Sequence, residues 1–157
     1  MKEVVMALMV WIGQNSPYDT TDMPIPQVVE MSPEELTDEA YSDAPHMKPE
    51  NGVDERVWAL YNFEEGPHGT IYILAADYTD DGAVPDEPSY MDPVFQERLL
   101  HELIHHVQYV SGAYDTFPCR NFGELDAYAL GGKFLKQRYA RDPLPNRHFW
   151  ARVYSRC

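Results

Sequence analysis

Apolar residues recur at every third or fourth position between residues 93 and 110. This period places them along one side of a helix, where they can anchor it in a core. Asp92 can cap the first turn, Pro93 suits the first helical position, and Gly112 follows as a stop signal. The apolar positions of this predicted helix are Leu99, Leu100, Leu103, Ile104, Val107 and Val110.

The N-terminal segment 2–15 is predicted to be an amphipathic helix. Its apolar run from Val4 to Ile12 is too short to span a bilayer. A signal peptide is not expected, because Glu3 interrupts the positive start and no small-residue cleavage site follows. We therefore assign this segment to the folded domain, with an apolar face formed by Val5, Leu8, Met9 and Ile12.

A further helix is predicted after a loop that contains Pro118 and Cys119. Asn121 is available to cap this helix. Gly131 and Gly132 each weaken a helix by about 1 kcal/mol relative to Ala. Residues 133–141 therefore either continue the helix or begin another, and residues 146–154 are predicted to form a terminal helix. The apolar positions after the loop are Leu125, Leu130, Phe134 and Leu135.

The strand signals lie in the first half of the chain. Residues 27–30 form a predicted short strand, and the capping box Ser32-Pro33-Glu34-Glu35 opens a helical turn. Residues 56–63 and 70–75 are rich in β-branched and aromatic residues and flank Gly66-Pro67-His68-Gly69, which predicts a hairpin. Residues 79–92 carry Gly, Pro and acidic residues and are predicted to form a loop. The expected class is α+β, with a small twisted sheet packed on helices.

Length and charge narrow the possibilities further. The chain has 157 residues and 44% hydrophobic composition, which suit one domain spanning residues 1–157. Its 26 acidic and 12 basic residues give a formal charge of -14. Such an acidic protein is repelled by nucleic-acid phosphates and anionic membranes. We therefore expect no nucleic-acid partner and no membrane span.

The predicted central helix carries the sequence His101-Glu102-Leu103-Ile104-His105, an HExxH arrangement. His101 and His105 lie one helical turn apart, so their imidazoles can converge on one metal ion. Glu102 points to the flank of the same face, where a carboxylate can take a proton from water instead of binding the metal. This pattern is typical of zinc hydrolases.

A catalytic zinc needs a third protein ligand. Glu124, at the start of the next predicted helix, is the best candidate. Asp126 competes with it, but two positions along a helix point to nearly opposite faces, so only one can face the metal. Asp115 and His148 are weaker candidates. The metzincin pattern is rejected, because Gln108 and Ser111 stand where Gly and His would be required.

His101 to His105 followed by Glu124 in a Glu-x-x-Ala setting resembles the gluzincin branch of the zincin metallopeptidases. More narrowly, residues 91–140 resemble small uncharacterised bacterial zincin-like proteins built around this motif. The resemblance implies a minimal zincin-like domain with one Zn²⁺ per chain, held by His101, His105 and Glu124, and Glu102 as general base. Many gluzincins carry Asp one helical turn after the ligand Glu, whereas this chain has Tyr128. In the family this Asp orients a metal-binding histidine, so the residue that would orient a histidine differs in this chain.

The leading functional expectation is a zinc-dependent peptidase that cleaves peptide or amide bonds of a peptide or protein substrate. The alternative is a non-catalytic zinc-binding or protein-interaction domain that keeps the zincin scaffold. A weaker idea, from charge alone, is an acidic toxin or immunity-type partner protein. The oxyanion donor could be any of Tyr114, Tyr128, His106, His148 and Arg147, although a packing or surface role is more typical for His106.

Two features remain open at this level. The strand 70–75 could bind an extended peptide if it forms a sheet edge, or could be a paired internal strand. Cys119 and Cys157 could form a disulfide that ties the C-terminus to the loop before Glu124, or remain free thiols. A disulfide would indicate a periplasmic or secreted protein, so the compartment is not assigned.

Overall fold

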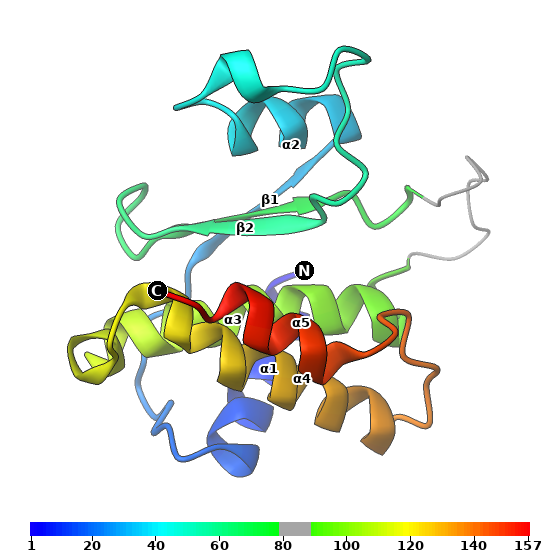
Figure 1. Cartoon of the computed structure of the whole chain (residues 1–157). Helices are drawn as coiled ribbons and strands as arrows, with labels where there is room; N and C mark the ends of the chain where they lie inside the picture. The colour runs from blue at the N-terminus through cyan, green and yellow to red at the C-terminus, as the bar shows by residue number, and fades with distance from the viewer. Residues whose placement is uncertain (79–88) are drawn as a thin grey trace.

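The computed structural model describes residues 1–78 and 89–157. Within them the chain forms five α-helices and one sheet of three strands, which confirms the α+β class (Figure 1). The helices are α1 (Lys2–Asn15), α2 (Pro33–Ala40), α3 (Pro93–Val110), α4 (Glu124–Gln137) and α5 (Arg147–Tyr154). The strands are β1 (Gln27–Met31), β2 (Ala59–Asn62) and β3 (Thr70–Leu74), and the short 3-10 turns are η1 (Pro45–Met47), η2 (Ser89–Met91), η3 (Ala113–Thr116) and η4 (Arg120–Gly123).

The sheet lies between two helical layers. Its order is β1-β3-β2, with β1 parallel and β2 antiparallel to β3. Figure 1 shows α2 on one face and α3 on the other. Successive side chains of β3 point to opposite faces, so Ile71 and Ile73 enter the core with α3, whereas Tyr72 and Leu74 pack with Leu36 of α2. Both faces of β3 are therefore buried.

β1 and β2 are the two edge strands, and residues 70–75 form the paired internal strand, so they are not available as a peptide-binding edge. β3 pairs with β1 on one side and with β2 on the other, so its backbone groups are already used. The predicted hairpin is confirmed, with Asn62 opposite Thr70. Its first strand begins at Ala59 instead of Arg56.

α3 is the central helix of the larger core. Five of its six predicted apolar positions are fully buried, but Val110 is 39% exposed because it lies at the C-terminal end of the helix. Asp92 caps the first turn by accepting from the backbone N–H groups of Val94 and Phe95, as predicted. Gly112 follows α3 with a left-handed φ of 74°. Of the predicted loop 79–92, residues 79–88 lie outside the described part.

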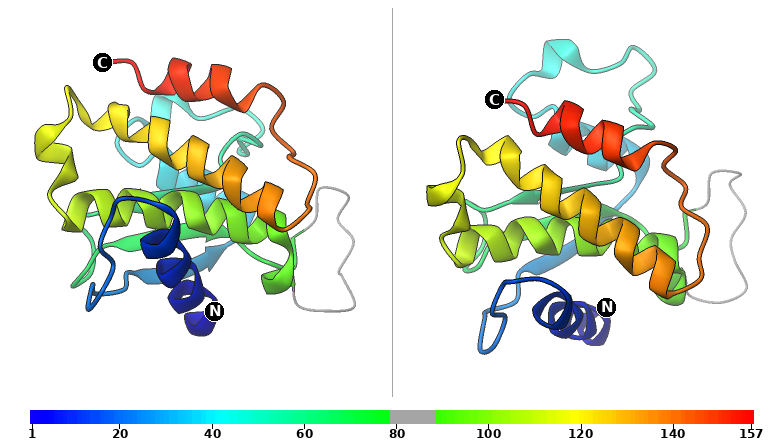
Figure 2. Two further views of the ribbon diagram at one scale, coloured as in Figure 1. Left: turned by 90° about the horizontal axis from the view of Figure 1, so that it is seen from below. Right: turned by 60° about the horizontal axis from the view of Figure 1, so that its bottom comes forward.

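The N-terminal segment forms the predicted helix α1, and its four predicted apolar residues are buried. α1 crosses α3, while α4 lies alongside α3 and carries α5 on its other side (Figure 2). None of the helices in residues 1–78 and 89–157 combines the length and apolar composition needed to cross a lipid bilayer.

α4 runs without interruption through Gly131 and Gly132 and ends at Gln137, so residues 133–141 do not begin a separate helix. The expected cap Asn121 is wrong: it lies in η4 and donates from Nδ2 to the carbonyl of Arg156, 2.9 Å away. Cys119 and Cys157 form a disulfide. The C-terminus is therefore fastened to the segment that leads into α4.

Candidate metal centre

The two histidines of the HExxH segment meet the first residue of α4. The Nε2 atoms of His101 and His105 are 3.3 Å apart. Oε2 of Glu124 lies 3.1 Å from the His101 nitrogen, and its Oε1 lies 3.4 Å from the His105 nitrogen. These are the three residues that the sequence predicted as metal ligands, and the structure brings all of them together.

The spacing of these atoms fits a small tetrahedral metal ion. In a tetrahedral zinc site with bonds of 2.0 to 2.1 Å, neighbouring ligand atoms are about 3.3 Å apart. The nitrogen and oxygen separations of 3.1, 3.3 and 3.4 Å cluster around this value. Imidazole nitrogens and a carboxylate are also the ligand types that zinc accepts at catalytic sites. The residues present therefore fit the metal that the resemblance implies.

The electrostatics of the three residues favour ionised Glu124. Burial alone would raise the pKa of Glu124, but hydrogen bonds from His101 and His105 lower it well below its ordinary value. Burial would lower the pKa of His105, yet the hydrogen bond to Glu124 and the charges of Glu102 and Glu124 raise it. Without a metal, the negative charge of Glu124 thus favours a positive charge on the neighbouring imidazole of His105.

Glu102 lies beside this cluster without joining it. Its side chain is 9% exposed and makes no hydrogen bond or ion pair to any residue of 1–78 or 89–157. Burial raises its pKa above the ordinary value, and the neighbouring carboxylates of Glu124 and Glu97 add to this, while His101 and His105 oppose it. A buried carboxylate without a partner is costly, so packing alone does not explain this position.

A second layer of residues orients His105. Nε2 of Gln108 donates to the backbone carbonyl of Gly123 at 2.9 Å, which turns Oε1 of the same amide toward Nδ1 of His105 at 3.1 Å. The hydroxyl oxygen of Tyr114 also lies 3.1 Å from this nitrogen. Because Oε1 can only accept, the His105 proton is assigned to Nδ1, and Nε2 keeps its lone pair for a metal. Sequence reasoning missed the role of Gln108, although its helical spacing from His105 is a usable signal.

His101 is supported differently. The ring of Tyr128 packs edge-on against it, with ring centroids 4.9 Å apart. Within residues 1–78 and 89–157, Nδ1 of His101 has no hydrogen-bond acceptor. The Tyr128 ring therefore supports His101 through an aromatic contact.

The remaining candidates are used elsewhere. Asp126 accepts a hydrogen bond from Tyr18 at 2.6 Å and points away from the ligands. His106 is fully buried, donates to the carbonyl of Pro24 and accepts from Tyr61, so its packing role is confirmed. Arg147 pairs with Glu97 and Asp142. Neither Asp115 nor His148 belongs to the group of residues that could hold a metal, among those the structure describes.

No protein-family model, curated protein or solved structure matches this chain. The functional argument therefore depends on the geometry of the site and on the residues that form it.

Proposed function

We propose that this protein is a zinc-dependent hydrolase that cleaves peptide or amide bonds. The observation that carries the proposal is a triangle of ligand atoms from His101, His105 and Glu124 with the unpartnered carboxylate of Glu102 beside it. This combination supplies the ligands and the base that metal-assisted hydrolysis requires.

A zinc ion held by these three residues would polarise a substrate carbonyl and lower the pKa of the attacking water toward neutrality. Glu102 accepts the proton of that water and then passes it to the leaving amine nitrogen. Its raised pKa suits this exchange, because a base that titrates closer to neutral pH can both take up and release a proton.

Among the oxyanion candidates we favour Tyr114, whose hydroxyl oxygen lies 3.1 Å from Nδ1 of His105. Its oxygen shares the Nδ1 proton of His105 with Oε1 of Gln108, which leaves the Tyr114 hydroxyl proton available for a substrate oxygen. Burial and the charges of Glu124 and Glu102 raise the pKa of Tyr114, so the hydroxyl remains protonated. Arg147 and His106 are committed to other partners and do not compete with it.

Of the two edge strands, we propose β2 as the peptide-binding strand, because it packs against α3. β2 runs in the same direction as α3, as three successive contacts along the two elements show. Trp58, just before β2, contacts Arg98. Further along, Tyr61 contacts His106, and Phe63, just after β2, contacts Tyr109. Among the described strands it pairs only with β3, so its outer backbone groups can bind an extended peptide.

The test is Glu102→Gln. We expect the variant to retain one zinc per chain and to lose about 100-fold or more of its hydrolytic activity, because general-base catalysis contributes 10²–10⁴-fold. Zinc is measured by elemental analysis, and cleavage by mass spectrometry of a diverse peptide mixture.

Asp126→Asn is the matched control, because it removes a carboxylate of α4 that does not face the ligands. His101→Ala and Glu124→Ala should lose the metal. Unchanged hydrolysis by Glu102→Gln would refute the mechanism.

A second candidate function is zinc binding without catalysis. It is favoured by His101, because no acceptor among the described residues orients its Nδ1 as one usually orients a metal-binding histidine. A purified protein that holds one zinc but cleaves nothing in the peptide mixture would establish this alternative. We also propose an oxidising compartment, because disulfides such as Cys119–Cys157 persist in secreted and periplasmic proteins.

A further inference from the structure

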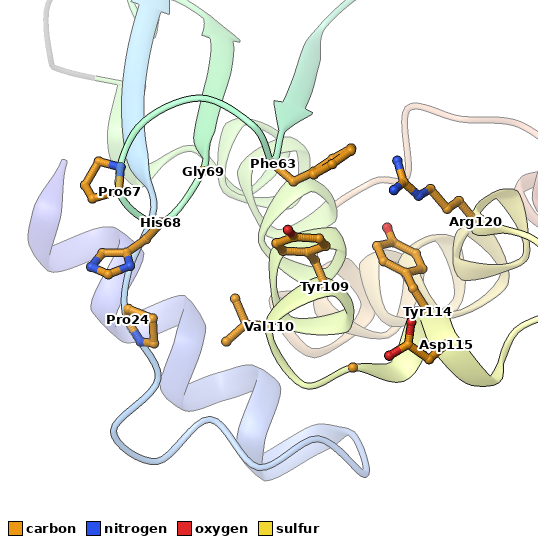
Figure 3. A pocket seen from close by; sticks show the side chains of 11 residues that line it. Pro24, Phe63, Pro67, His68, Gly69, Tyr109, Val110, Tyr114, Asp115 and Arg120 are labelled. Carbon is orange, nitrogen blue, oxygen red and sulfur yellow. The ribbon is translucent and has the colours of Figure 1, made fainter.

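A cavity of about 610 Å³ lies at the C-terminal end of α3, between that helix and the β2–β3 turn (Figure 3). We call it the Arg120 pocket. Its size is within the range of sites that bind small molecules or single side chains. Its apolar and aromatic walls are formed by Pro24, Phe63, Pro67, Tyr109, Val110 and Tyr114.

The Arg120 pocket adjoins the candidate metal centre through Tyr114. This side chain lines the cavity, and its hydroxyl lies 3.1 Å from Nδ1 of His105. Because Tyr114 contacts His105 and also lines the cavity, it lies between the candidate metal centre and the pocket. Phe63 directly follows the edge strand β2 and contacts Tyr109 with ring centroids 5.0 Å apart. A peptide bound along β2 would therefore reach the pocket.

Arg120 brings a guanidinium to the wall of this cavity. Its guanidinium lies 4.2 Å from the centroid of the Phe63 ring, and Figure 3 shows it directed toward Phe63 and Tyr114. Within residues 1–78 and 89–157 it makes no hydrogen bond and no ion pair. A guanidinium beside a ring can still use its N–H donors to bind a planar anion such as a carboxylate.

We propose that the Arg120 pocket is a substrate subsite that selects a residue bearing a carboxylate next to the bond that is cleaved. Arg120 binds the carboxylate, and the aromatic walls pack against the apolar stem of the same residue. This inference rests on the proposed hydrolase function and adds a substrate class to it.

The lining also contains one acidic residue, Asp115. Figure 3 shows it away from Arg120, with the ring of Tyr114 between them in this view. Its charge opposes a bound carboxylate, so Asp115→Asn should tighten binding. His68 lies on the far wall, beside Pro24 and Pro67.

The carboxylate has two sources in a peptide. A peptide antiparallel to β2 would place the side chain of a residue on the N-terminal side of the cleaved bond in the pocket, because β2 leads toward Phe63. A peptide parallel to β2 would instead place its C-terminal carboxylate there. The chemistry at Arg120 is the same in both cases, so the experiment must separate them.

The test measures binding rather than cleavage. Phenylpropanoate and phenylpropanamide differ only in the charged group, and both are titrated into zinc-loaded and metal-free protein, with amide chemical shifts followed by NMR. We expect the carboxylate to bind about tenfold more tightly than the amide in both forms, as a charge-assisted hydrogen bond allows. Arg120→Gln should abolish the difference, and Arg120→Lys should keep part of it.

Arg138→Gln is the matched control. Arg138 is also an exposed arginine above a ring, with its guanidinium 4.9 Å from the Phe134 centroid, but it lies at the far end of α4. Its removal should leave the preference for the carboxylate unchanged. Acetyl-Phe-Glu-amide against acetyl-Phe-Gln-amide then tests a side-chain carboxylate, and acetyl-Ala-Phe against its amide tests a chain terminus.

Equal binding of carboxylate and amide, or a preference that survives Arg120→Gln, would overturn the inference. If the preference for the carboxylate requires zinc and is unchanged in Arg120→Gln, the carboxylate binds the metal. This result would overturn the subsite proposal and leave the hydrolase proposal standing. An Arg120-dependent preference in a protein that takes up no zinc would support the pocket and refute the hydrolase. A preference in only one peptide pair supports the pocket and identifies the source.

Discussion

His105 is fixed in place by a residue that binds no metal. Gln108 is completely buried and connects Nδ1 of His105 to the carbonyl of Gly123, immediately before the proposed ligand Glu124. One amide group thus sets the tautomer of one ligand and the position of the helix that carries another. This dual contact makes Gln108 the residue on which the geometry of the site depends most, apart from the ligands themselves.

We expect Gln108→Leu to weaken zinc binding about 10- to 100-fold, because loss of a residue that orients a ligand has this typical effect. Competition with a chromogenic chelator measures the affinity. Gln96→Leu is the control, because Gln96 is a buried glutamine of the same helix that donates to the carbonyl of Tyr90 and contacts no ligand. If both variants bind zinc as the wild type does, Gln108 has only a structural role.

At the scale of elements, the close approach of α3 and α4 depends on Gly131. A Cβ atom at this position would collide with Oε1 of Glu97, which is paired with Arg147 at 2.6 Å in the buried contact between α3, α4 and the start of α5. The two glycines therefore do not break α4. Glycine has a lower helix propensity than alanine, but its lack of a side chain lets the buried Glu97–Arg147 ion pair lie directly against the helix backbone.

We expect Gly131→Ala to lower the free energy of unfolding by about 2 to 4 kcal/mol, since displacing a buried ion pair costs more than Ala gains in helix propensity. Gly132→Ala is the matched control. Its Cβ would meet Cδ of Arg147 at 3.0 Å, and a small movement of that flexible stem relieves the contact. Denaturant unfolding compares the two, and an equal effect would contradict this explanation of Gly131.

At the scale of the whole molecule, the C-terminal segment fastens the candidate metal centre. The Cys119–Cys157 disulfide closes a loop with a sequence separation of 38, and this loop contains all of α4 and α5. The rings of Tyr128 and Tyr154 stack with centroids 6.1 Å apart, so α5 also supports the residue that packs on His101. The disulfide and the Tyr128–Tyr154 contact therefore both restrain the position of α4, which carries Glu124.

We expect Cys157→Ser to lower the free energy of unfolding by about 3 to 4 kcal/mol, the value that loop-closure entropy gives for a loop of this length. Zinc affinity should fall as well, because the segment before Glu124 is released. Guanidinium unfolding and zinc titration measure these effects. The Cys119→Ser/Cys157→Ser double variant should match the single variant, and identical unfolding of oxidised and reduced wild-type protein would contradict the prediction.

Local patterns in the sequence were sufficient to predict α3, its Asp92 cap and the convergence of His101 and His105. Helical periodicity and capping depend on neighbouring residues, so they can be recognised without knowing the rest of the fold. The HExxH spacing and one downstream carboxylate also predicted the ligand set, and α4 does bring Glu124 to the histidines.

Tertiary packing decided the remaining features: the internal position of β3 in the sheet, the Tyr18–Asp126 contact, the Gln108 bridge, the disulfide and the pocket beside Arg120. Each depends on residues that are distant in sequence, and their meeting depends on how the whole core packs. For the same reason the periodic pattern did not predict the exposure of Val110. Periodicity identifies the apolar face of a helix, but it does not show how far the packed neighbours extend along that face.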